Sequence, residues 1–323
     1  MEQETLAAQT LEAIGTDALY DESVKRLLAN KSILAVILKE CVPEFKHCTT
    51  REIAEQYIEG EPQIGEVGIA PDETNRSGEV IHGLNTEGAA LTEGSIRYDI
   101  RFYASAPGED GLIGLIINLE AQNRFNPGYP LLKRAIYYCS RMISAQYGTE
   151  FTKSEYGNIK KVYSIWICSN PPRDWRNTIT QYSIREEQIV GEAKEEVKNY
   201  DLMSAVMICL GEETDRNYSG LLKFLEVLLS DEKTAAAKKT ILQNEFDVPM
   251  TQTLETEVYQ MCNLSQGAIE KGIQKGYGKG REEERIASVR NLMQNLHMTA
   301  EDAMKALNIP QEDRDRIKKA LAN

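Results

Sequence analysis

The chain has 323 residues, of which 41% are hydrophobic and 27% charged, a composition typical of a globular protein with a sizeable core. It has no long apolar run, and its start shows no basic segment followed by an apolar one, so we expect neither a membrane span nor a secretory signal. Its six cysteines form no CxxC pair and it has three histidines, which argues against a zinc site and indicates a reducing, cytoplasmic location.

The formal net charge of −13 is unevenly distributed along the chain. Residues 97–185 hold 12 Lys and Arg against 7 Asp and Glu, a net charge of +5. Residues 1–96 carry a net −11 and residues 186–323 a net −7. Because binding to nucleic acid is largely electrostatic, the middle segment is the part whose charge is compatible with a DNA partner.

The N-terminal part of the chain predicts helices. An apolar stripe over residues 19–42 indicates one helix, with Asp21 as its candidate N-cap and Pro43 as its stop. Residues 49–58 predict a second, short helix. Residues 59–95 are acidic and poorly periodic, so we expect a long loop with one or two short strands.

The clearest local signal is a β-hairpin. Residues 96–103 alternate apolar and polar side chains with period two, which predicts a strand. Residues 107–111 have the composition of a turn. Residues 112–122 are apolar at nearly every position, as expected for a central strand buried on both faces.

This hairpin predicts a pair of opposed acids. If its turn is centred between Glu109 and Asp110, Asp99 and Glu120 are direct cross-strand partners. Gln122 lies two residues beyond Glu120 and therefore points to the same face.

The remaining elements of the middle segment predict a mixed sheet. A helix is expected over residues 131–147 and a strand over 161–168. Two further strand-like runs cover residues 182–190 and 203–210. The order hairpin, helix, strand indicates an α/β fold with a mixed sheet core flanked by helices.

From residue 219 onward the pattern is mostly helical. We therefore predict an α/β domain over 1–215, a helical extension over 216–265, and a Gly-rich, charged helical segment with a small helical tail over 266–323. Helices of this kind often mediate self-association, so a homo-oligomer formed through the C-terminal helices is one expectation.

Two facing carboxylates repel each other unless positive charge lies between them. A hard divalent cation with oxygen ligands, Mg²⁺ or Mn²⁺, would remove this repulsion at Asp99 and Glu120. The alternative is that the acids face solvent or pair with Arg97 and Arg101, which lie on the same predicted face as Asp99. The place of Glu120 at the end of an apolar strand favours the metal site.

Three segments carry a resemblance to a known family: Tyr98-Asp99-Ile100-Arg101, Asn118-Leu119-Glu120-Ala121-Gln122, and Arg134-Ala135-Ile136-Tyr137-Tyr138-Cys139-Ser140-Arg141. Their order and spacing resemble the bacterial PD-(D/E)XK nuclease family transposases, which are similar to the recombination-promoting nucleases. The resemblance covers most of the chain, because it extends to Tyr20-Asp21-Glu22 with Lys25, Ile58-Glu59-Gly60-Glu61, Met261-Cys262-Asn263-Leu264-Ser265 and Leu307-Asn308-Ile309-Pro310.

This resemblance implies a restriction-endonuclease-like core, Mg²⁺-dependent cleavage of DNA, and a role in transposition or recombination. Asp99 and Glu120 match the metal-binding acids of the family. Gln122 falls where the broader superfamily places a catalytic lysine, and a neutral amide orients water without supplying charge. Our hypothesis is that Arg134, or Lys133 beside it, supplies the missing positive charge.

The hypothesis rests on a stripe formed by Arg134, Tyr137, Tyr138 and Arg141 on the helix after the acid strand. The competing interpretation is that the two tyrosines pack against the sheet and the arginines are solvated. For Trp166 and Trp175 we expect core and loop packing rather than stacking on bases.

Two functions follow from these residues. The leading prediction is a cytoplasmic, metal-dependent DNA endonuclease that hydrolyses phosphodiester bonds. The alternative is a catalytically degenerate nuclease fold that acts as a DNA- or protein-binding assembly module. Gln122 in place of lysine, the acidic net charge and the helical C-terminal third support the alternative.

Overall fold

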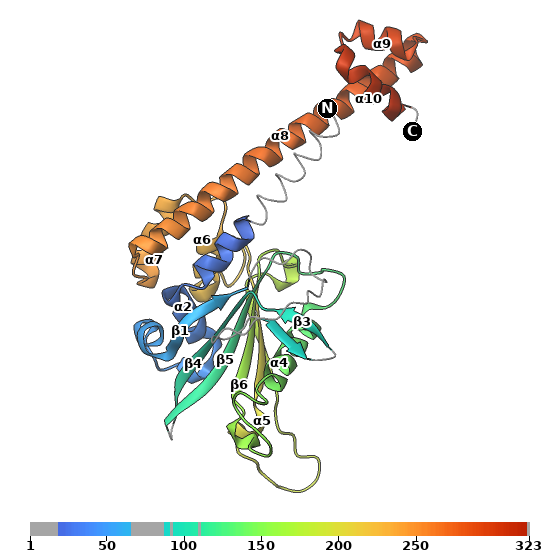
Figure 1. Cartoon of the computed structure of the whole chain (residues 1–323). Helices are drawn as coiled ribbons and strands as arrows, with labels where there is room; N and C mark the ends of the chain where they lie inside the picture. Colours follow the sequence, from blue (N-terminus) through green and yellow to red (C-terminus); the bar gives the residue numbers. More distant parts are fainter. Residues whose placement is uncertain (1–18, 66–86, 91–92, 109–110, 322–323) are drawn as a thin grey trace. The chain divides into compact units, whose positions relative to one another are not determined.

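The computed structural model describes residues 19–65, 87–90, 93–108 and 111–321 (Figure 1). The chain divides into two compact units, Met1–Asn263 and Leu264–Asn323, and helix α8 (Gln252–Leu296) contains the boundary between them. The predicted regions 1–215 and 216–265 lie together in the first unit, because the helices after residue 215 share a hydrophobic core with the sheet.

Two helices stand where a single helix over residues 19–42 was predicted. Residues 19–28 are helical, and α2 (Lys31–Cys41) begins after a break at Asn30. The backbone of Asn30 is extended, and its side chain accepts a hydrogen bond from the Ser32 N–H at 3.0 Å. Asparagine is among the preferred N-cap residues, so this side chain starts a new helix where the apolar stripe alone indicated continuity.

The ends of these helices test two further predictions. Residues 19 and 20 are already helical, so the prediction that Asp21 is the N-cap is wrong. The predicted stop at Pro43 is confirmed, because α2 ends at Cys41 and Pro43 begins a separate turn. The short elements that follow are η1 (Pro43–Phe45), α3 (Thr50–Glu52), capped by Thr49 and Glu52, and η2 (Ile53–Tyr57).

A six-stranded mixed sheet forms the centre of the first unit. Its strands are β1 (Ile58–Ile64), β4 (Ile100–Gly108), β5 (Gly111–Gln122), β6 (Lys161–Cys168), β7 (Thr178–Ser183) and β8 (Met203–Cys209). The order is β1-β4-β5-β6-β8-β7, with β5, β6 and β8 parallel to each other and the other pairs antiparallel. This confirms the predicted mixed α/β sheet and the central place of β5.

The hairpin register agrees with the prediction, but its first strand does not. Ile100 pairs with Leu119 and Arg101 with Asn118, as expected for a turn centred between residues 109 and 110. The predicted strand over 96–103 is instead interrupted by a bend at Asp99. The residues before the bend belong to a separate two-stranded sheet of β2 (Glu87–Ala90) and β3 (Glu93–Arg97).

The prediction of a strand over 182–190 is wrong for most of its length. The strand that pairs with β8 is β7, which ends at Ser183. Ile189 and Val190 are 91% and 95% exposed, so these apolar residues find no buried sheet face. The residues that pair with β8 are those of Thr178–Ser183, in which more buried and more exposed side chains alternate.

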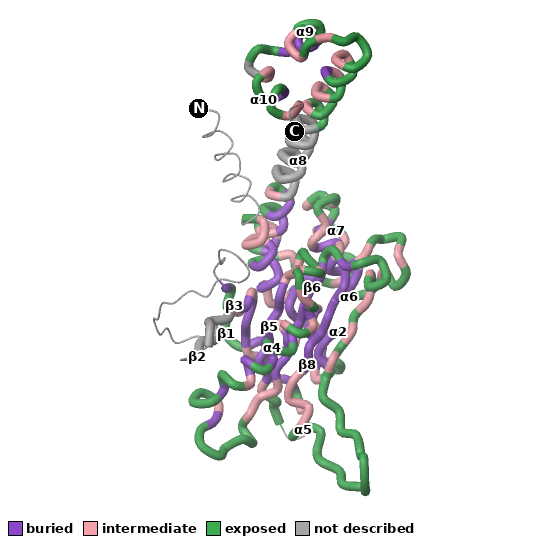
Figure 2. The backbone as a smooth tube through the Cα atoms, turned by 90° about the vertical axis from the view of Figure 1, so that its right-hand side faces the viewer, coloured by how far each residue is buried: buried purple, intermediate pink, exposed green. Residues whose placement is uncertain are grey.

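Helices cover both faces of the sheet (Figures 1 and 2). On one face the sheet packs against α2, α6 (Gly220–Leu229), α7 (Ala235–Phe246) and the first turns of α8. On the other face it packs against α4 (Leu131–Ser144), which is shorter than the predicted helix over 131–147. The remaining short elements of this unit are η3 (Tyr156–Asn158), η4 (Arg173–Trp175) and α5 (Val197–Tyr200).

The second unit contains the end of α8, α9 (Ala300–Ala306) and α10 (Gln311–Leu321). It has a small core of its own, formed by Val289, Ala303, Met304, Ile309 and Ile317. The mostly helical C-terminal part was predicted from the sequence, and it is confirmed. Of the helices in the ranges that the structure describes, none is both long and apolar enough to cross a membrane.

Candidate functional site

The two predicted acids lie side by side, Asp99 in the bend just before β4 and Glu120 near the end of β5. The Asp99 N–H donates a hydrogen bond to Glu120 Oε1 at 3.1 Å. The Ala121 N–H donates to Asp99 Oδ2, also at 3.1 Å. Each carboxylate is therefore held by a backbone N–H of the other segment. The two residues are neighbours, as the hairpin predicts, although the ladder of paired residues ends at Ile100 and Leu119.

The bend that positions Asp99 depends on a glycine at the end of β1. The Gly65 N–H donates to the Asp99 carbonyl at 2.9 Å. A Cβ at Gly65 would lie 2.3 Å from the Tyr98 carbonyl oxygen, so another residue cannot approach this closely. On its far side the bend turns Tyr98 into the core beneath α4, where its ring packs edge-on against Tyr138 at 5.2 Å.

Burial gives the acid pair unusual electrostatics. Glu120 is 3% exposed. Burial raises its pKa well above the ordinary value and the neighbouring Asp99 raises it further, whereas Arg134 opposes the rise. Burial also raises the pKa of Asp99, although the charge of Lys25 acts in the opposite direction. The pair is therefore poorly neutralised, and additional positive charge between the two carboxylates would be stabilising.

Lys25 is the cation that lies beside Asp99. Its Nζ is 2.9 Å from Asp99 Oδ1 and 2.8 Å from Asp21 Oδ2. Burial alone would lower the pKa of Lys25, but Asp99 and Asp21 hold it above its usual value, so the amine is charged at neutral pH. The lysine comes from the helix over residues 19–28, on the opposite sheet face from α4.

Lys25 was not predicted from the sequence to be part of the site. The available signal was its four-residue spacing from Asp21, which puts both on one helix face, together with the inclusion of Asp21 and Lys25 in the family resemblance. Nothing local to the sequence indicates that this helix face meets the bend at Asp99.

Arg134 lies on α4 and reaches the same region from the other face. Its Nε and Nη2 donate to the Tyr138 hydroxyl at 3.0 and 2.6 Å, and its Nη1 donates to the Tyr129 hydroxyl at 3.0 Å. The guanidinium also lies over the Trp166 ring, 5.4 Å from its centroid. Tyr129, Tyr138 and Trp166 thus hold the Arg134 guanidinium in place. Its positive charge lowers the pKa of Glu120.

The other residues of the predicted α4 stripe divide between core and solvent. Tyr138 and Arg141 are buried, whereas Tyr137 is 49% exposed. The interpretation that both tyrosines pack against the sheet therefore holds for Tyr138 alone, and the arginines are not simply solvated. Trp166 is fully buried, as expected for core packing.

Gln122 and Lys133 are placed less favourably for a role in the site. The Gln122 side chain donates from Nε2 to the Arg124 carbonyl at 3.0 Å, so its amide is engaged by the loop after β5. Lys133 is exposed. The structure thus brings together Asp99, Glu120 and, through its charge, Arg134, and it adds Lys25.

The donor set available for a metal consists of the two carboxylates. Within residues 19–65, 87–90, 93–108 and 111–321, three or more His, Cys, Asp or Glu side chains nowhere form a group that could hold a metal ion. Asp99 and Glu120 supply hard oxygen donors that suit Mg²⁺ or Mn²⁺. Mg²⁺ commonly takes one or two protein carboxylates and completes its shell with water and substrate phosphate, so this pair fits such an ion.

Comparison with known proteins adds no relative. No family model matches the chain, and neither a curated protein nor a solved structure matches it. Function is therefore inferred from the residues of this chain and their arrangement.

Proposed function

We propose that the protein is a metal-dependent DNA endonuclease with a restriction-endonuclease-like core, of the PD-(D/E)XK type that its sequence resembles. The observation that carries the proposal is the opposed Asp99–Glu120 pair, which is locked by reciprocal backbone hydrogen bonds and raised in pKa by burial. A role in transposition or recombination follows from the resemblance.

Asp99 and Glu120 are the residues that would hold Mg²⁺ or Mn²⁺. Burying two carboxylates together is costly, and a divalent cation would offset their repulsion. When bound, such an ion lowers the pKa of a coordinated water and stabilises negative charge on a phosphoryl oxygen. The backbone hydrogen bonds to both acids fix the orientation of their carboxylates before any ligand arrives.

Lys25 and Arg134 supply the positive charge that Gln122 lacks. Lys25 is charged and lies at hydrogen-bonding distance from Asp99, and Arg134 is held by two tyrosine hydroxyls within electrostatic range of Glu120. Fixed cations beside a phosphodiester stabilise the negative charge that develops on it as the bond to the leaving oxygen breaks. Gln122 keeps the role of orienting water through its amide oxygen.

The second candidate function is a binding module that has lost catalysis. One observation favours it: the Nζ of Lys25 lies 2.9 Å from Asp99 Oδ1, so Asp99 already has a positively charged partner without a metal. In that case the acids, Lys25 and Arg134 form a buried ion network that fixes the fold.

A nicking assay on supercoiled plasmid tests the proposed function. We expect the full chain to nick DNA with Mg²⁺ or Mn²⁺ and the Asp99→Asn and Glu120→Gln variants to lose this activity. The matched control is Asp315→Asn, because Asp315 is an exposed aspartate of α10, in the second unit.

Metal binding provides an independent readout. The parent and the control should show a thermal shift with Mg²⁺ or Mn²⁺, because a ligand that binds the folded state stabilises it, and both site variants should show none. If the parent neither nicks DNA nor responds to either ion, the nuclease is excluded and the binding module is favoured.

A further inference from the structure

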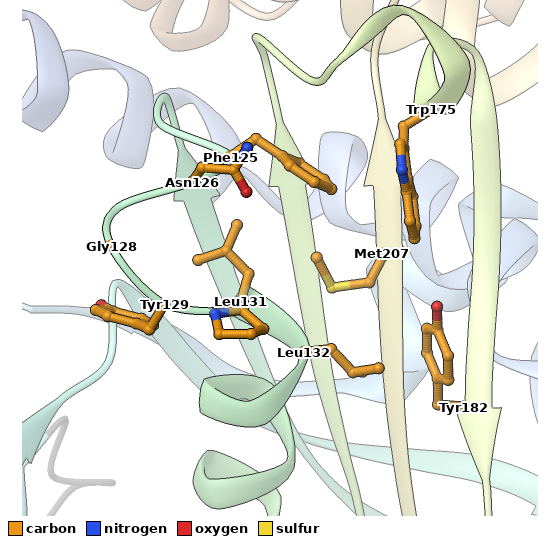
Figure 3. A pocket seen from close by; sticks show the side chains of 10 residues that line it. Phe125, Asn126, Gly128, Tyr129, Leu131, Leu132, Trp175, Tyr182 and Met207 are labelled. Carbon is orange, nitrogen blue, oxygen red and sulfur yellow. The ribbon is translucent and has the colours of Figure 1, made fainter.

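An aromatic pocket lies next to the acid site on the α4 side of the sheet. It has a volume of about 520 Å³, within the usual range for ligand pockets. Its walls come from the loop between β5 and α4, the first turn of α4, η4, β7 and β8. Figure 3 shows five of the lining side chains around a common space: Phe125, Leu132, Trp175, Tyr182 and Met207. Tyr129 also lines the pocket but lies farther from these side chains.

The aromatic rings of this pocket are partly open to solvent. Trp175 is 39% exposed, and its ring centroid is 5.3 Å from that of Phe125 at an angle of 50°. Trp175 thus shows the loop packing that the sequence indicates, yet much of the indole remains uncovered. Exposed aromatic faces on loops are the surfaces on which proteins stack unpaired nucleobases.

The pocket also offers polar groups for the edge of a base. Asn126, which is exposed, lies at one wall, and the hydroxyl of Tyr182 points toward Trp175 at another (Figure 3). A mainly apolar pocket with a few polar groups is the usual form of a small-ligand site. An amide and a hydroxyl both donate and accept hydrogen bonds, as the edge of a nucleobase requires.

Arg134 links the pocket to the acid site. Tyr129, in its wall, accepts a hydrogen bond from Arg134 at 3.0 Å, and Arg134 lowers the pKa of Glu120. Phe125 follows closely after Gln122, the last residue of the acid strand. A nucleotide whose base lies in the pocket would therefore have its phosphate on the side of the two acids.

The exposed basic residues that adjoin the pocket lining outnumber the exposed acid Asp174 beside Trp175. Arg124 lies in a second groove that shares Phe125 and Asn126 with the pocket, and Arg173 and Lys133 are exposed on neighbouring elements. Apolar walls with a cationic rim match a base attached to a phosphate backbone. Charge complementarity thus favours a DNA strand over an apolar peptide.

We propose that this pocket binds an unpaired nucleobase of the DNA strand whose phosphate lies at Asp99 and Glu120. The inference rests on the proposed nuclease function and deepens it, because it names the substrate class as single-stranded or locally unpaired DNA. The base stacks on the exposed part of the Trp175 indole, which Phe125 supports from its other side. Arg124 and Arg134 lie along the backbone.

Binding can be measured without cleavage. The probe is a fluorescein-labelled oligodeoxythymidine of about 15 nucleotides, long enough for a single-strand site, with EDTA present. We expect Trp175→Ala and Phe125→Ala each to weaken binding about tenfold, in the range measured for loss of one stacked base. Tyr259→Ala serves as the control, because Tyr259 is a 60% exposed aromatic on α8.

Two comparisons separate stacking from a change of fold. Trp175→Phe should restore most of the affinity, since an aromatic face remains. An abasic oligonucleotide should bind the parent about as weakly as the thymidine strand binds Trp175→Ala. Because the other tryptophan, Trp166, is fully buried, quenching of the exposed Trp175 on addition of the thymidine strand provides a direct signal.

The outcomes distinguish the pocket from the nuclease. Unchanged affinity in Trp175→Ala and Phe125→Ala, equal binding of abasic and normal strands, or no binding by the parent overturns the pocket proposal. Weaker binding by the pocket variants, in a protein that does not cleave plasmid, supports the pocket while rejecting the nuclease. If cleavage depends on Asp99 and both cleavage and binding are unchanged in Trp175→Ala, the nuclease is supported and the pocket proposal is rejected.

Discussion

Replacing Lys25 by methionine should destabilise the first unit by about 3 kcal/mol at pH 8. Removing one partner of a buried ion pair commonly costs about 3–5 kcal/mol, because the other charge stays buried without compensation. Here the side chains of Lys25 and Asp99 are 10% and 20% exposed, which places the pair at the lower end of that range. The contact with Asp21, whose side chain is 45% exposed, adds about 0.5 kcal/mol at most.

The loss should depend on pH in a definite direction. Burial already raises the pKa of Asp99, and removing Lys25 takes away the charge that opposes this rise. A carboxyl with a raised pKa in the folded state favours folding when protonated, and this stability disappears as the pH rises through the folded pKa. The difference between parent and Lys25→Met should therefore be smaller at pH 5 than at pH 8.

Urea unfolding followed by the fluorescence of the buried Trp166 measures this effect in the first unit. Lys46→Met is the matched control, because Lys46 is exposed and its removal should change stability by less than about 0.5 kcal/mol. Asp99→Asn in the Lys25→Met background should recover part of the loss, since no charge is then left unpaired at Asp99. A loss below about 1 kcal/mol, or one that is equal at both pH values, would refute this account of the site.

Three further predictions concern the same region. In the absence of metal, Glu120→Gln should be more stable than the parent at pH 8 but not at pH 5, because an amide accepts the hydrogen bond from the Asp99 N–H without a buried charge. Equal urea midpoints of the variant and the parent at pH 8 would contradict this. Arg134→Ala should lower kcat for plasmid nicking while Arg290→Ala, which removes an exposed arginine of α8, leaves it unchanged; equal rates would reject a role for Arg134. Gly65→Ala should lower the free energy of unfolding by about 1–3 kcal/mol and reduce nicking, because its Cβ would lie 2.3 Å from the Tyr98 carbonyl oxygen. Gly157→Ala is the control, because a Cβ at Gly157 meets open space and should leave stability nearly unchanged.

The acid pair could be predicted from the sequence because it depends on local rules. Period-two alternation, a turn of recognisable composition and the symmetry of a hairpin together set the partner of each residue. Ile100 lies opposite Leu119, so the register predicted from the turn holds as far as the first residue of β4. The strand over 161–168 was predicted for a similar reason, since a continuous apolar run indicates a buried strand.

The parts that could not be predicted depend on contacts between distant segments. The bend at Asp99 requires the close approach of Gly65, which comes from another strand. Lys25 reaches Asp99 from a helix whose own pattern indicates only which face is apolar. The segment 182–190 has strand-like composition, yet the residues that pair with β8 are Thr178–Ser183. A strand prediction from composition does not show which segment forms these pairs.

The edge strand β1 has a consequence for how this sheet behaves among other copies of itself. Its pairing with β4 is irregular between Glu59 and Gln63, and Pro62 within it has no N–H to offer. Glu59 and Glu61 add negative charge along the same edge, and both are exposed. Such an edge is a poor template for a strand from another chain, so this side of the sheet resists intermolecular aggregation.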